Sequence, residues 1–96
     1  MRLKSLGNAT FEAVNKEKMG CLKTIARLAP EAFLRRNWQG YTAIHVLAQK
    51  GNQEMIELLG SSHPEWLRIK RETDKHTPAM SAAYQGNLES FRAILS

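Results

Sequence analysis

Hydrophobic residues recur at helical spacing between Gly40 and Leu59, in two short runs separated by a polar turn. Thr42 is suited to cap the start of the first helix, and Gly51 is suited to end it. Gly60, with Ser61, Ser62 and Pro64 beyond it, marks the expected end of the second helix. The two apolar faces consist of Ile44, Leu47 and Ala48 in the first helix and Met55, Ile56, Leu58 and Leu59 in the second. A pair this short buries too little apolar area to fold alone, so we expect it to pack against similar pairs.

The same pattern lies on either side of this segment. A forward shift of 35 residues places Thr77 on Thr42 and a second Gly-Asn turn on the first one. A backward shift of 34 residues places Asn8, another good N-cap, on Thr42. We therefore expect three helix pairs, with the first helix over residues 8–17 after a lead-in over residues 1–7. The second helix of the first pair is expected to bury a stripe of Cys21, Leu22, Ile25 and Leu28.

The first two helix pairs are each followed by a connector that opens on a proline, Pro30 or Pro64. Proline is favoured at the first position of a helical turn, so a single turn is expected after each of them. Polar segments then lead from these turns to the next helix cap. The connectors therefore repeat together with the helices.

The segments that begin the first helix of the second and third pairs also share a sequence pattern. They read Thr42-Ala-Ile-His45 and Thr77-Pro78, and each is followed by an alanine near the helix end and then by Gly-Asn. In this they resemble the ankyrin-repeat pattern T-P-L-H-x-A. The resemblance implies one all-α domain over residues 1–96, an ankyrin-repeat solenoid of stacked helix-turn-helix units joined by hairpin-like loops, with approximate repeats at 7–39, 40–73 and 74–96. The chain departs from the pattern where other residues replace its proline, its histidine and two glycines, at Ala43, Met80, Lys75 and Glu17.

The resemblance also implies where a partner would bind. An ankyrin stack is similar to a cupped hand, in which the hairpin tips are the fingers and the exposed side of the first helices is the palm. The implied protein-binding residues are Trp38, Gln39, Tyr41, Thr73, Asp74 and His76 on the fingers and Gln49, Lys50, Tyr84 and Gln85 on the palm. Trp38 and Tyr41 stand out because large aromatic side chains contribute strongly at interfaces, and Tyr84 is expected at the interface as well. Alternatively, Trp38 folds back onto the neighbouring hairpin and only covers the stack.

The histidines and the cysteine have structural interpretations. His45 resembles the family's histidine that ties one repeat to the adjoining loop, and Cys21 is predicted to be a small buried core residue. No His, Cys, Asp or Glu residues have the close spacing of a zinc site, and no nucleophile elbow or nucleotide-binding loop is present. We therefore expect no catalytic residue, no metal and no cofactor, and a protein that is not an enzyme.

Composition narrows the function classes further. The chain of 96 residues has a net charge of +5, no apolar run long enough to span a bilayer, and one cysteine, which favours the reducing cytoplasm. Its connectors carry basic residues that stacking is expected to align as a band, namely Arg35, Arg36, Arg68, Lys70 and Arg71. Such a band is more typical of a solvated surface than of a nucleic-acid site, because no base-stacking aromatics are interleaved with it. Binding of nucleic acid or an acidic surface is the minor alternative.

The leading hypothesis is a monomeric scaffold that binds another protein. Two alternatives remain open, a targeting or substrate-recruiting module of a larger enzyme and a bacterial effector delivered into a host cell. Phe91 and Ile94 lie on a last predicted helix with no polar capping repeat behind it, so we expect the chain to be part of a longer protein.

Overall fold

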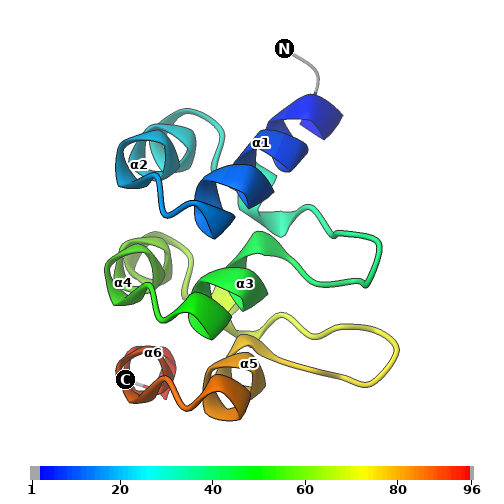
Figure 1. Cartoon of the computed structure of the whole chain (residues 1–96), viewed down its shortest axis with the longest axis vertical. Helices are drawn as coiled ribbons and strands as arrows, with labels where there is room; N and C mark the ends of the chain where they lie inside the picture. The colour runs from blue at the N-terminus through cyan, green and yellow to red at the C-terminus, as the bar shows by residue number, and fades with distance from the viewer. Residues whose placement is uncertain (1–2, 96) are drawn as a thin grey trace.

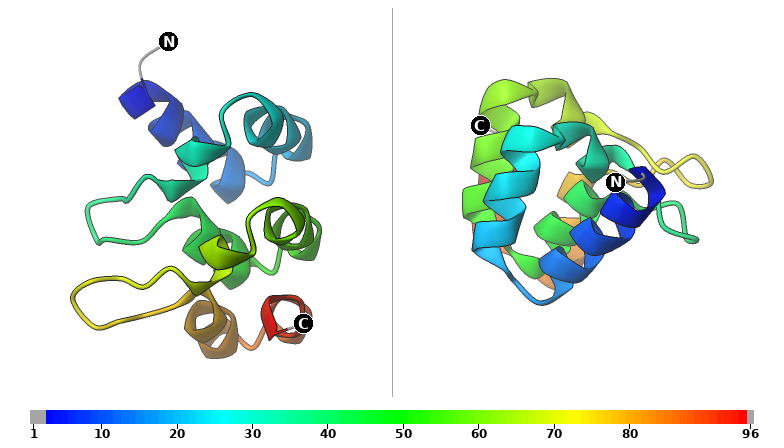
Figure 2. Two further views of the ribbon diagram at one scale, coloured as in Figure 1. Left: turned by 180° about the vertical axis from the view of Figure 1, so that it is seen from behind. Right: turned by 90° about the horizontal axis from the view of Figure 1, so that it is seen from above.

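The computed structural model describes residues 3–95, with side chains placed for residues 8–95. Its α-helices form three antiparallel pairs that stack on one another (Figure 1). The first repeat contains α1 (Leu3–Asn15) and α2 (Met19–Leu28), the middle repeat α3 (Ala43–Lys50) and α4 (Gln53–Ser62), and the third repeat α5 (Pro78–Gln85) and α6 (Leu88–Leu95). The helices α1, α3 and α5 form an inner layer, and α2, α4 and α6 form an outer layer (Figure 2). The predicted all-α solenoid is confirmed.

The middle repeat forms where its caps predict. The Thr42 hydroxyl accepts a hydrogen bond from the His45 backbone N–H, and the His45 ring accepts one from the Thr42 N–H, which completes a capping box. Gly51 ends α3 in the left-handed region with φ of +77°. Asn52 then caps α4 by accepting from the Met55 N–H at 3.2 Å.

The helix α4 ends at Ser62, within the predicted stop segment before Pro64, but Gly60 itself lies inside the helix and does not end it. The glycine instead permits a close contact with the following connector. A Cβ added at Gly60 would lie 2.8 Å from Cδ1 of Leu67. Helix packing, and not helix termination, therefore explains this residue.

The predicted start of α1 at Asn8 is wrong. The helix begins at Leu3, so most of the expected lead-in is helical, while Met1 and Arg2 lie outside the described residues. Asn8 is an exposed residue within the helix, and Gly7 before it lowers helix propensity by about 1 kcal/mol without ending the helix. The helix ends at Asn15, before Glu17 takes a left-handed φ of +54° in the role that Gly51 has in the middle repeat.

The proline connectors form short 3-10 helices, as predicted. They are η1 (Pro30–Leu34) and η2 (Pro64–Arg68). After each one the chain extends away from the helices, as the first hairpin over residues 35–42 and the second hairpin over residues 69–77 (Figure 1). The two hairpins project on the same side of the stack and lie next to each other (Figure 2). Their bases are closed by hydrogen bonds of 2.8 Å from the Asn37 N–H to the Tyr41 carbonyl and from the Arg71 N–H to the His76 carbonyl.

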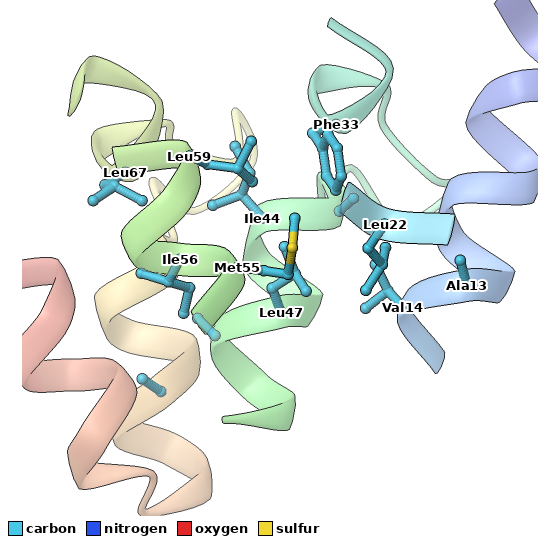
Figure 3. Close-up of a cluster of buried hydrophobic side chains, with 13 residues drawn as sticks. Ala13, Val14, Leu22, Phe33, Ile44, Leu47, Met55, Ile56, Leu59 and Leu67 are labelled. Carbon is cyan, nitrogen blue, oxygen red and sulfur yellow. The ribbon is translucent and has the colours of Figure 1, made fainter. Parts of the chain in front are cut away.

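The core runs between the two helical layers (Figure 3). It is densest in the middle repeat, where Ile44, Leu47, Met55, Ile56 and Leu59 are buried, as predicted. Leu22 and Phe33 join it from the first repeat.

Three predicted core positions lie at the surface instead. Leu58 is 37% exposed on the outer side of α4, and Leu28 is 71% exposed at the end of α2. Cys21 is exposed as well, which contradicts its assignment to the core. The equivalent residue of the middle repeat, Met55, is buried because the first repeat covers it, whereas nothing in the described chain covers Cys21.

Candidate protein-binding groove

A concave groove of about 840 Å³ runs along the inner helices and the bases of the hairpins. It brings together seven of the ten residues that the resemblance implied, which are Gln39, Tyr41, Gln49, Asp74, His76, Tyr84 and Gln85. The remaining lining residues are Asn8, Phe11, Asn15, Asn37, Val46, Arg71 and Ser81. The groove therefore spans all three repeats and both hairpins.

Three sequence-derived candidates lie outside the groove lining. Trp38 is 91% exposed at the tip of the first hairpin, so the alternative in which it folds back onto the stack is wrong. Thr73 is exposed on the second hairpin. Lys50 lies at the end of α3, where its Nζ donates to the Asn15 carbonyl at 3.4 Å and joins the middle repeat to the first.

The first hairpin is shaped by Asn37. Its Oδ1 accepts hydrogen bonds from the backbone N–H groups of Gln39 at 2.9 Å and Tyr41 at 3.0 Å, which folds the loop into a tight turn. Arg36 reinforces the turn by donating to the Gly40 carbonyl at 2.8 Å and, across to the second hairpin, to the Lys70 carbonyl at 3.1 Å. This network presents Trp38 on an internally bonded loop.

Arg71 connects the second hairpin to the first. Its guanidinium forms an ion pair with Asp74, donates to the Gln39 carbonyl at 3.2 Å, and lies 4.1 Å from the centre of the Tyr41 ring. The hydrogen bond from Arg71 lowers the pKa of the Asp74 carboxyl to about 2. Two members of the expected basic band, Arg36 and Arg71, are thus bound to carbonyl oxygens, and the charge of Arg71 is balanced by Asp74.

His45 supports the floor of the groove. Its Nε2 lies 2.8 Å from the His76 carbonyl, which can only accept, so the proton is on Nε2 and the neutral Nδ1 accepts from the Thr42 N–H at 3.3 Å. Burial lowers the pKa of His45 and favours this neutral form. The link from this histidine to the adjoining loop, which the resemblance implied, is confirmed.

Three aromatic rings follow one another across the groove. The His76 ring lies 5.5 Å from the Tyr41 ring and is stacked on the Tyr84 ring at 5.4 Å, with centroid distances in both cases. Its Nε2 is also 3.0 Å from the Ser81 hydroxyl, which fixes the ring on α5. Tyr84 remains 80% exposed, so it offers most of its surface to a partner.

Sequence reasoning missed several lining residues. Arg71 had a recognisable signal, because it stands 35 residues after Arg36 and both reach backbone carbonyls of the hairpins. Phe11 is partly buried against the core and also lines the groove. Asn37 and Ser81 carry no such signal, since ordinary polar residues of this kind occur throughout the loops.

Other kinds of site find no support in the part of the chain that the structure describes. No three His, Cys, Asp or Glu side chains within residues 8–95 are grouped so that they could hold a metal ion. None of the described helices is long and apolar enough to cross a membrane.

Comparison with known proteins agrees with the repeat architecture. A family model for ankyrin repeats, in three copies, matches residues 10–96. No solved structure matched the chain significantly.

Proposed function

The chain belongs to the ankyrin repeat family, and we propose that it binds a partner protein through the concave groove and the hairpin tips. Ankyrin repeats are generally protein–protein interaction modules and are typically non-catalytic. The observation that carries the proposal is the groove itself, which spans the three repeats beneath a projecting, exposed tryptophan. In this proposal the chain supplies recognition and no chemistry of its own.

The two aromatic residues Trp38 and Tyr84 are the proposed anchors. Trp38 projects from the first hairpin, and Tyr84 lies on the palm formed by the inner helices. Large aromatic side chains that become buried on binding contribute much of the affinity of an interface. The hydrogen-bonded first hairpin orders the backbone that carries Trp38, and the His76 stack orders the Tyr84 ring, which lowers the entropy lost when these residues are immobilised.

The groove is polar but nearly neutral between these anchors. Six of its lining side chains are carboxamides, namely Asn8, Asn15, Asn37, Gln39, Gln49 and Gln85. Carboxamides both donate and accept hydrogen bonds, and the ion pair between Arg71 and Asp74 balances the charges in the lining. This composition favours a partner segment that is uncharged and rich in hydrogen-bonding groups.

Replacement of both Trp38 and Tyr84 by alanine tests the proposal. We expect partner proteins that crosslink to the wild-type chain in cell extract to be lost, because removal of one anchor typically costs about 2 kcal/mol and two such losses exceed a 100-fold change in Kd. Tyr41 is left intact because Arg71 lies against its ring. Replacement of exposed Leu28 by alanine on α2 is the matched control, since it should leave capture and helical circular dichroism unchanged. Equal capture by the double variant and the wild type would refute this site.

A further inference from the structure

Each end of the stack presents an apolar surface. Inside the stack, the equivalent surface of each repeat is covered by the adjacent repeat. At one end lies the N-face, which we define as Ala9, Ala13, Cys21 and Ile25, lining a groove of about 800 Å³ between α1 and α2. In the middle repeat the equivalent residues are buried, and they are Ala43, Leu47, Met55 and Leu59. In the first repeat Ala9 and Cys21 are exposed and Ile25 is partly buried, while Ala13 is buried as well, so for three of the four residues the position in the stack decides the exposure.

At the opposite end lies the C-face, which we define as Met80, Ala83, Leu88 and Phe91. Leu88 is 55% exposed, Ala83 is exposed, and a hollow of about 230 Å³ between α5 and α6 is lined by three of the four residues. Ala83 corresponds to Ala48 in the middle repeat and to Val14 in the first, and both of these are buried. Phe91 corresponds likewise to the buried Ile56.

The C-face and the N-face are complementary because equivalent positions of neighbouring repeats already pack on each other inside the stack. Inside the stack, the C-face positions of one repeat pack onto the N-face positions of the next, where α1 meets α3 and α3 meets α5 (Figure 1). The third repeat displays the same C-face positions, and the first repeat displays the same N-face positions with an open groove. Contact between the two ends would continue an interface that the molecule already forms twice.

Polar side chains that could form hydrogen bonds between repeats are also present at the two ends of the stack. Inside the stack, Lys50 donates to the Asn15 carbonyl, and Asn87 donates to the Ala48 and Gln49 carbonyls at the end of α3. In the first repeat the equivalent positions hold Lys16 and Lys18. Two lysines suit the C-terminal end of α5, whose terminal carbonyls carry the negative end of the helix dipole. In the single chain Lys16 forms an ion pair with Glu12. On association, Lys16 would share its hydrogen bonds between Glu12 and the carbonyls at the end of α5 in the second copy.

We propose that the chain associates with a second copy of itself head to tail, with the C-face of one copy on the N-face of the next. This association goes beyond partner binding in the concave groove and does not depend on it. It also differs from the monomer expected from the sequence. The contact is heterologous because a different face of each copy takes part in it. Since each copy keeps its other face free, the contact leads to open chains of copies and not to closed symmetric dimers.

Sedimentation velocity of the wild-type chain and two single-face variants tests the proposal. Cys21→Glu places a charge in the N-face, and Ala83→Glu places one in the C-face; both residues are exposed in the single chain, so folding should be preserved and is checked by circular dichroism. We expect the wild type to associate progressively between about 10 μM and 1 mM, in the range of weak protein contacts, and each variant to associate at least ~10-fold more weakly. An equimolar mixture of the two variants should form a 1:1 dimer that does not grow, because each retains one intact face.

Several results would overturn the proposal. A wild-type chain that stays monomeric over the whole range would leave the end faces to another occupant, such as a further repeat or a different protein. A mixture that fails to form dimers while the wild type associates would show that the C-face does not bind the N-face, and a single variant that still dimerises alone as strongly as the wild type would indicate a symmetric contact between like faces. Trp38→Ser is the control for association through the exposed fingertip, and it should leave association unchanged.

A second measurement requires no charged substitution. Coupling a bulky maleimide to Cys21 should block association of the otherwise native chain, because the thiol lies in the N-face groove. Cys21→Ser exposed to the same reagent should still associate. Undiminished association of the alkylated chain would contradict the proposal even if both glutamate variants behaved as expected.

Discussion

The middle and third repeats have the same helix pair, the same threonine cap and the same Gly-Asn turn, yet they are packed differently. In the middle repeat, His45 completes a capping box and also bonds to the next hairpin. In the third repeat, the equivalent Met80 is 47% exposed and no described hairpin follows it. Likewise Met55 is buried in the core, whereas the equivalent Ser90 buries its hydroxyl without a hydrogen-bond partner among the described residues.

This comparison shows that an equal sequence pattern does not give equal packing. A repeat with neighbours on both sides gains apolar contacts and a polar link from each of them, whereas a terminal repeat gains them from one side only. The stability of the stack should therefore be concentrated in the middle repeat, and matched substitutions in the two repeats should have unequal effects.

The largest difference is expected for the matched core residues Leu59 and Ile94. Leu59 is fully buried, so Leu59→Ala should lower the free energy of unfolding by about 2–5 kcal/mol through the cavity it leaves. Ile94 is only partly buried, so Ile94→Ala should cost clearly less. Urea unfolding followed by circular dichroism measures both. Equal losses would show that the third repeat is as well packed as the middle one.

His45→Met gives the middle repeat the residue of the third. It removes the hydrogen bond to the buried His76 carbonyl and should cost about 1–3 kcal/mol near neutral pH. The reverse change, Met80→His, should alter stability by at most about 0.5 kcal/mol because Met80 is exposed. Similar effects of the two substitutions would contradict the special role of the middle junction.

The same substitution should change the pH dependence of stability. Burial lowers the pKa of His45 in the folded chain, so the unfolded chain takes up the proton first as the pH falls below about 6.5. Stability should therefore decline below this pH and level off once the pH passes the lower pKa of the folded state. Urea midpoints of the wild type and His45→Met, compared between pH 8 and pH 5, test this point, and a decline of equal size in both would exclude His45 as its source.

Ser90→Ala should raise the stability of the fold, whereas a typical core substitution lowers it. Removing a buried hydroxyl that has no hydrogen-bond partner should stabilise the third repeat, by about 1 kcal/mol, because the cost of desolvating that group disappears. Thermal unfolding measures the change. A loss of stability would mean that the hydroxyl has a partner such as an ordered water.

Ala43→Pro should have the smallest effect. It gives α3 the proline that α5 has at its first position, Pro78, where the missing N–H needs no partner within the helix. We expect a change between zero and a gain of about 1 kcal/mol, measured by thermal unfolding. Unfolding of the variant would show that the two helix starts differ more than their caps suggest.

Much of the fold could be predicted because its signals are local. Thr42, Thr77 and Gly51 act on their own helix ends, and the repeat period carried these assignments along the chain. The first repeat was less accurate because its signals are weaker, with Asn8 inside a helix and Glu17 in place of a glycine. The exposure of Cys21 could not be predicted from its spacing, since it depends on whether another repeat covers it.

The groove was predicted in part for the same reason. The period identified which residues occupy the palm, such as Gln49 and Tyr84, because those positions repeat. The bonds of Arg71 to Gln39 and Asp74 depend on how two hairpins approach each other in space, and spacing alone does not specify that approach. Loop interactions of this kind require the structure.

The exposure of Trp38 gives the chain an optical probe of its own. Its indole lies in water at the fingertip, whereas the only other tryptophan, Trp66, is stacked on the His63 ring with centroids 3.8 Å apart. A partner that covers the fingertip would move the fluorescence emission of Trp38 to shorter wavelengths. Replacement of Trp66 by phenylalanine would leave Trp38 as the single emitter, so that binding could be titrated without any label.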